Sequence, residues 1–290
     1  MSSEKLILCG IDLGPDTGPV LSYAAGFAAA LDCRVRLLYV IDYLLTPPAY
    51  MHTYLEEEKK REEGEMKKWA ERLSALGITT ESSIITGRLH ESFTSTIEES
   101  RPDLMVIGYK SHMLRPSSSE RLIMTLKVPM LVVRPKPGHA PEPGSVRVSR
   151  VLCPVDFSEN SRKALAAAGN YARAFGAELT VINVVPSHLI KDRWAIWGGM
   201  DEDNQSRFDE SMYADATSTM ASFCTAAGLV NAHEILQGDP GGVITSFARE
   251  RDFDLVVIGA RGLSFLQSII IGSTTIQVLK SSPCPVLVVH

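Results

Sequence analysis

The chain has 290 residues, which is enough for one large domain or for two of ordinary size. Its 45% hydrophobic and 22% charged residues are typical of a globular protein with substantial cores, and its net charge of −5 argues against a surface that coats nucleic acid. No apolar stretch reaches the ~20 residues that span a bilayer, and the N-terminal residues MSSEKLILCGID lack the pattern of a signal peptide.

The first half alternates apolar runs with stretches of helical character. The predicted strands cover residues 5–12, 34–41, 78–86, 103–107 and 129–134. The predicted helices cover residues 17–32, 54–76, 90–100 and 120–127, with 42–53 as a loop. Asp16 or Thr17 could cap the first helix, and Gly77 ends the second. Because strand and helix alternate, we expect parallel strands joined by right-handed crossovers.

The second predicted helix is strongly charged. Its apolar stripe consists of Trp69, Leu73 and Leu76, which we expect to face the core. The charges around the stripe are spaced for pairs one turn apart, and we interpret them as a solvated face.

Residues 135–146 contain four prolines and two glycines without a hydrophobic period, which predicts an extended linker. After the linker the pattern starts again. A shift of 144 residues places Cys9 on Cys153 and Asp12 on Asp156. Later segments match at shifts of 151 and 156, as for RPDLMVIGY with DFDLVVIGA and VPMLVV with CPVLVV.

The repeat predicts two α/β domains, residues 1–134 and 147–290, each of a size that can fold independently. In each we expect a doubly wound, Rossmann-like fold: a five-stranded parallel sheet with helices on both faces. A ligand should then bind at the carboxyl ends of the strands, near the point where the strand order reverses.

The five cysteines are widely spaced and form no CxxC pair, so neither a disulfide framework nor a zinc site is indicated. Cys9 and Cys153 fall inside predicted strands, where a free cysteine usually acts as a small buried hydrophobe. This usage fits a reducing compartment, and we expect a cytoplasmic protein.

The most informative stretch lies near the C-terminus. An apolar run, residues 255–258, ends at Gly259, and Gly262 follows three positions later. After nine further residues Gly272-Ser273-Thr274 opens a predicted helix. Glycines let backbone amides approach an anion, and a helix N-terminus favours negative charge. The pattern predicts a phosphate-binding cradle that is neither a P-loop nor a GxGxxG fingerprint.

The spacing G-x2-G-x9-G-[ST], with Gly259, Gly262, Gly272 and Ser273 at the fixed positions, resembles the nucleotide signature of the ATP-binding universal stress proteins. The resemblance covers both halves apart from the linker and residues 187–203. It implies a tandem universal stress protein that binds ATP or another adenine nucleotide in its second half, with Mg²⁺ attending the phosphates. The alternative is that the glycines only make turns and Ser273 only caps a helix.

The resemblance also implies an adenosine site. It places Val155 and Asp156 at the adenosine and Val184 at the base, and we add Pro154, just before them, to the candidate site. A carboxylate suits a ribose hydroxyl or an amino group, and an apolar wall suits the base. Asp156 could instead cap the following helix, and Val184 could be ordinary core.

Two further residues complete the candidate site, and a nearby turn could border it. Arg261, between two glycines, could reach a phosphate or point to solvent, and Thr274 adds a hydroxyl to the cradle. Gly238-Asp239-Pro240 could border the pocket or simply form a turn into the next helix.

The first half departs from the signature. Tyr109 follows Gly108, the loop to the next helix is shorter, and no Gly-Ser-Thr appears. Residues 117–119 are serines that could cap a helix, and Lys110 and Arg115 could hold an anion. We expect nucleotide binding in the second half only.

No histidine pair or nucleophile elbow is visible, so little or no turnover is expected. The leading hypothesis is an ATP-binding stress-response or regulatory protein. The alternatives are a slow ATPase or nucleotidyl-transfer enzyme and a scaffold that binds no nucleotide. The terminal strands near Leu131 and Leu287 should pair within the chain as a pseudo-dimer, or between chains as a homodimer. Nucleic acid and membrane are not expected partners.

Overall fold

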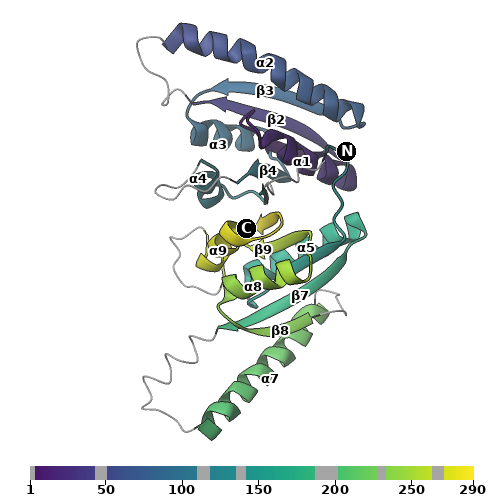
Figure 1. The fold of residues 1–290 in the computed structure, drawn as a ribbon, viewed down its shortest axis with the longest axis vertical. Helices are drawn as coiled ribbons and strands as arrows, with labels where there is room; N and C mark the ends of the chain where they lie inside the picture. The colour runs from purple at the N-terminus through teal and green to yellow at the C-terminus, as the bar shows by residue number, and fades with distance from the viewer. Residues whose placement is uncertain are drawn as a thin grey trace. The chain divides into compact units, whose positions relative to one another are not determined.

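The computed structural model describes residues 4–42, 51–109, 118–134, 142–186, 202–226, 233–262 and 271–290. The chain divides into two compact units, Met1–Arg147 and Val148–His290. In each of them strands and helices alternate along the chain (Figure 1). No described helix is both long and apolar enough to cross a membrane.

The first domain contains a parallel sheet with strand order β3-β2-β1-β4-β5. Its strands are β1 (Lys5–Gly10), β2 (Cys33–Ile41), β3 (Thr80–Thr86), β4 (Leu104–Gly108) and β5 (Met130–Val133). Its helices are α1 (Thr17–Leu31), α2 (Met51–Ala75), α3 (Leu89–Ser100) and α4 (Ser118–Thr125). The side chains of the central strands β1 and β4 are almost all buried, as expected for strands covered on both faces.

The second domain repeats this order as β8-β7-β6-β9-β10, again with parallel neighbours. Its strands are β6 (Arg150–Pro154), β7 (Glu178–Pro186), β8 (His233–Gly238), β9 (Leu255–Gly259) and β10 (Val286–Val289). Its helices are α5 (Glu159–Phe175), α7 (Glu202–Ala226), α8 (Pro240–Glu250) and α9 (Ser273–Ser281). The duplicated, doubly wound α/β fold predicted from the sequence is confirmed.

Backbone conformation confirms the register of the repeat. Three pairs of residues, matched by the shifts of 144 and 151, have φ between 46° and 66°: Leu13 with Phe157, Asp32 with Gly176, and Arg101 with Asp252. Left-handed backbone is costly for residues other than glycine. Its recurrence at matched positions means that both domains make the same turns at these points.

Two local predictions for the first domain were wrong. Leu76 is 46% exposed, because α2 ends at Ala75, whereas Met66 and Leu73 of this helix are buried in the core. Asp16 stands at the start of α1 but makes no side-chain cap. The carboxylate of Asp12 acts here instead, accepting hydrogen bonds from the Gly14 N–H and the Thr17 hydroxyl.

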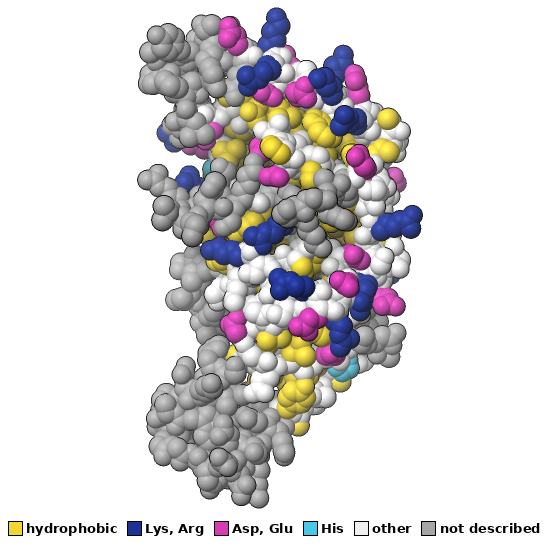
Figure 2. Space-filling model, in the orientation of Figure 1, with side chains coloured by type: hydrophobic (Ala, Val, Ile, Leu, Met, Phe, Trp, Pro, Cys, Tyr) yellow, Lys and Arg dark blue, Asp and Glu magenta, His cyan; other side chains and the backbone are white. Residues whose placement is uncertain are grey.

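The surface shows no segregation of charge on the face drawn in Figure 2. Lysine and arginine side chains are interspersed there with aspartate and glutamate side chains. Such mixing favours solvation over binding to a polyanion. All five cysteines are buried free thiols, as predicted for Cys9 and Cys153.

Candidate functional site

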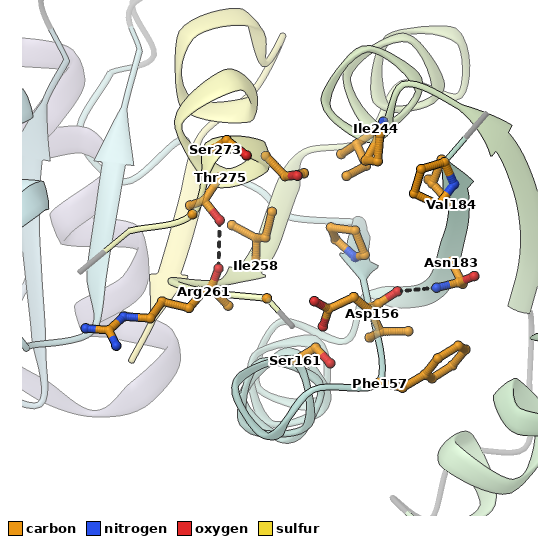
Figure 3. Close-up of a pocket in the computed structure, with 18 of the residues that line it drawn as sticks. Asp156, Phe157, Ser161, Asn183, Val184, Ile244, Ile258, Arg261, Ser273 and Thr275 are labelled. Atoms are coloured by element: carbon orange, nitrogen blue, oxygen red, sulfur yellow. Dashed lines mark hydrogen bonds between the residues drawn. The ribbon is translucent and has the colours of Figure 1, made fainter. Parts of the chain in front are cut away.

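A cavity of about 500 Å³ lies in the second domain, at the carboxyl ends of β6, β7 and β9 and beside the first turns of α8 and α9 (Figure 3). β6 and β9 are neighbours in the sheet, and the strand order reverses between them. Doubly wound sheets bind ligands at this point, and the volume is in the usual range for small-molecule sites.

The structure brings all the candidate site residues together around this one cavity: Pro154, Val155, Asp156, Val184, Gly259, Arg261, Gly262, Gly272, Ser273 and Thr274. Pro240, from the turn considered above, lines it as well. Sequence reasoning missed the remaining lining residues, which are Phe157, Ser161, Asn183, Val185, Pro186, Ala216, Ile244, Ile258 and Thr275.

Asp156 lies two residues beyond the end of β6 and does not cap α5. Its Oδ1 accepts a hydrogen bond from the Ser158 N–H at 3.1 Å, and Ser158 caps the helix by accepting from the Ser161 N–H. Phe157, between them, has φ 66°, so the chain turns sharply at this point. The turn leaves the Asp156 carboxylate directed into the cavity, toward the loop that holds Arg261 (Figure 3).

The three signature glycines have different structural roles. A Cβ on Gly259 would stand 3.0 Å from the backbone carbon of Asn160, so this glycine lets α5 pack closely on β9. A Cβ on Gly262 would overlap the carboxylate of Asp156. By contrast, the nearest atoms of the described residues would be 3.7 Å from a Cβ on Gly272, an ordinary contact.

Gly272 is also unconstrained by its own backbone. Its φ of −75° and ψ of 153° are accessible to any residue. The described protein atoms therefore give no reason for a glycine here. A ligand approaching the backbone at the start of α9 would give one.

The start of α9 is held firmly against β9. The Gly272 N–H donates to the Ala260 carbonyl at 2.8 Å, and the Thr275 hydroxyl donates to the Gly259 carbonyl at 2.8 Å. Gly272 is the N-cap residue and offers no side-chain acceptor to the first amides of the helix. The first turn of α9 can therefore present N–H groups and its positive dipole end to an anion.

The opposite part of the cavity is apolar. Val184, near the end of β7, and Ile244 of α8 lie close together on this side, with Phe157 below them (Figure 3). Ala216 brings α7 to the same wall, and the Phe157 ring meets that of Phe223 on α7 edge to face. A flat apolar group would find contacts on several sides here.

Three hydrogen bonds brace the cavity walls, and the first of them is buried. The Asn183 amide donates to the Val155 carbonyl at 2.8 Å, which ties β7 to the end of β6. Asp239 caps α8 by accepting from the Gly242 N–H, and the same oxygen accepts from the Gln277 amide on α9. The prediction of a turn into α8 at Asp239 is confirmed, and this turn also fixes α8 against α9.

Other candidate charges contribute less. Arg261 lines the cavity, but its guanidinium points away from it in Figure 3. Lys110, Arg115 and the side chains of Ser117 and Ser118 lie outside the described residues. In the described ranges no group of three or more histidine, cysteine or acidic side chains could hold a metal ion.

Known proteins resemble the chain at the level of each domain and of the whole. A family model described as the universal stress protein family matches residues 4–134 and 147–290. A universal stress protein of Methanocaldococcus jannaschii is 31% identical over 143 residues, 48% of this chain and 81% of that protein. The universal stress protein YxiE of Bacillus subtilis is 28% identical, over 49% of this chain and 99% of its own.

The fold of the entire chain also recurs in a solved structure. The crystal structure of a universal stress protein from Archaeoglobus fulgidus has a TM-score of 0.74 at 23% sequence identity, and the match covers 98% of this chain and 96% of that one.

Proposed function

The chain belongs to the universal stress protein family, and on this premise we propose that its second domain binds an adenine nucleotide, with ATP the leading candidate. The base would lie against the apolar wall of Val184 and Ile244, and the phosphates would lie at the first turn of α9. Mg²⁺ would accompany the phosphates, and Asp156 is a carboxylate in the cavity lining that could serve it or the ribose.

The observation that carries the proposal is Gly272. It stands at a helix N-terminus and faces the cavity, and neither its backbone conformation nor any neighbouring atom of the described residues requires a glycine there. A glycine with these properties supports a ligand that closely approaches the backbone. Helix N-termini favour anions, and the apolar wall supplies the complementary surface for a base.

The proposed role is binding with little or no turnover, in a stress-response or regulatory setting. Occupancy would stabilise the second domain by mass action. We place the protein in the cytoplasm, where reduced thiols such as the five buried cysteines persist.

Thermal unfolding of the full chain with ATP, ADP, AMP, cyclic AMP or GTP tests this function. An adenine nucleotide at a hundredfold excess over its Kd should stabilise by about 2.7 kcal/mol, which raises the Tm. No shift with any adenine nucleotide would favour the scaffold alternative. Steady phosphate release at several turnovers per second would favour the ATPase.

A further inference from the structure

The part of the first domain that corresponds to the cavity is crowded by an aromatic ring. The ring is that of Phe93 on α3, which is 3% exposed. A Cβ on Gly10, at the end of β1, would stand only 2.8 Å from the ring and 3.1 Å from a methyl group of Ile107. Phe93 therefore lies directly on the backbone of Gly10, with Ile107 beside it.

The same three positions line the cavity of the second domain. The shifts of 144 and 151 residues, which the matched left-handed residues support, carry Gly10 to Pro154, Phe93 to Ile244 and Ile107 to Ile258. These three counterparts all border the cavity. Compared with the second domain, the first has a larger side chain at the helix position, Phe93 for Ile244. It has no side chain at the strand position, where Gly10 stands for Pro154. Both changes let the ring lie over the strand end.

The two domains also differ in charge at the helix that follows the fourth strand. In the first domain this helix is α4, and in the second it is α9. Glu120 lies in the first turn of α4, and its Oε1 accepts a hydrogen bond from the Tyr109 hydroxyl at 2.8 Å. Tyr109 corresponds to Ala260. The Arg134 guanidinium lies over the Tyr109 ring, 5.2 Å from the ring centroid. The chain thus keeps a carboxylate of its own at this helix start, where it would repel a phosphate.

We propose that the Phe93 ring fills the base-binding part of the first domain, and that the Tyr109–Glu120 pair puts a carboxylate at the helix where phosphates would bind. The first domain is then a permanently filled copy, and only the second responds to ligand. This inference rests on the proposed function for its meaning. Its geometry is independent of that function.

Transplanting the ring into the second domain tests the proposal. In the full chain, Pro154→Gly with Ile244→Phe reproduces the first-domain arrangement and should weaken adenosine and ATP binding at least tenfold. Pro154→Gly alone is the reference variant, because Pro154 itself lines the cavity, and the tenfold loss is measured against its affinity. Calorimetry gives the affinities, and circular dichroism checks the fold. If the double variant binds like the reference variant, the ring does not close such a site.

A second measurement needs no nucleotide. Phe93→Ala should leave an apolar cavity in the first domain, and such cavities bind benzene. Benzene should then raise the Tm of this variant, or of Phe93→Leu if alanine prevents folding, and leave wild type unchanged. A variant that does not respond would overturn the filling role of Phe93. If wild type binds no nucleotide but the variant responds to benzene, only the proposed function fails.

Discussion

The carboxylate of Asp156 occupies the space that a side chain at Gly262 would need. The two residues are 106 positions apart in sequence, and the fold brings them together at the edge of the cavity. The contact gives the second signature glycine a specific purpose. It lets the loop after β9 approach Asp156, which lies two residues beyond the end of β6.

Replacing Gly262 with alanine should displace Asp156 and lower nucleotide affinity about tenfold or more, equivalent to about 1.4 kcal/mol. Isothermal titration calorimetry of the full chain measures the effect. Gly169→Ala is a matched control, because a Cβ there would meet no atom of the described residues within 4 Å. It lies in α5, where alanine is the better helix former, so affinity should stay unchanged and stability should hold or rise. Wild-type affinity in Gly262→Ala would contradict the role of this contact.

Gly272 and Gly259 should separate binding from stability. Gly272→Val should abolish nucleotide binding, because its side chain would enter the space next to the α9 N-terminus, while the free energy of unfolding changes by no more than about 1 kcal/mol. Gly259→Ala should instead lower that free energy by about 1–3 kcal/mol, because its Cβ meets the Asn160 backbone at 3.0 Å. Urea unfolding and calorimetry report the two quantities. Full binding in a folded Gly272→Val chain would remove the phosphate site from this loop.

The cysteines should resist thiol reagents in the folded protein. Burial raises the pKa of the Cys9 and Cys153 thiols well above the usual range, and it also raises the pKa of Cys33 and Cys224. A raised pKa keeps the thiol protonated at pH 8, where the thiolate is the reactive form. Ellman's reagent at pH 8 should therefore react slowly until denaturant is added. Rapid labelling of several thiols in the native chain would show that the strands open readily.

The terminal strands offer a test of domain pairing. Within its own domain β5 pairs with β4, and β10 pairs with β9, and each is the last strand of its domain in chain order. An exposed apolar edge is an aggregation hazard unless it is paired. We expect the strands to pair within one chain, because the linker gives a high effective concentration. A chain with Leu131→Cys and Leu287→Cys should form a monomeric cross-linked product at low concentration. Exclusively dimeric products would instead support pairing between chains.

Much of this structure could be predicted from local signals. The alternation of apolar runs with amphipathic stretches gave the sheet, and the internal repeat gave its duplication. The boundaries were less accurate, because α2 begins at Met51 within the predicted loop. The signature positions converge on one cavity because glycines and short polar residues follow the strand ends in sequence.

Residues that reach the cavity through packing were harder to predict. Asn183 had a usable signal, since it is a lone amide within the apolar run of β7. Thr275 also had one, as the third hydroxyl after Gly272. Ala216 had none, because only the docking of α7 brings it to the wall. The crowding of Gly10 by Phe93 likewise depends on a contact between residues distant in sequence.

The most direct test of the central claim is the stoichiometry of nucleotide binding to the intact chain. Titration of the purified, nucleotide-stripped protein with ATP and Mg²⁺ in a calorimeter should give one site per chain, and Gly272→Val should abolish that site. Two sites per chain, or one site that survives in Gly272→Val, would contradict the account.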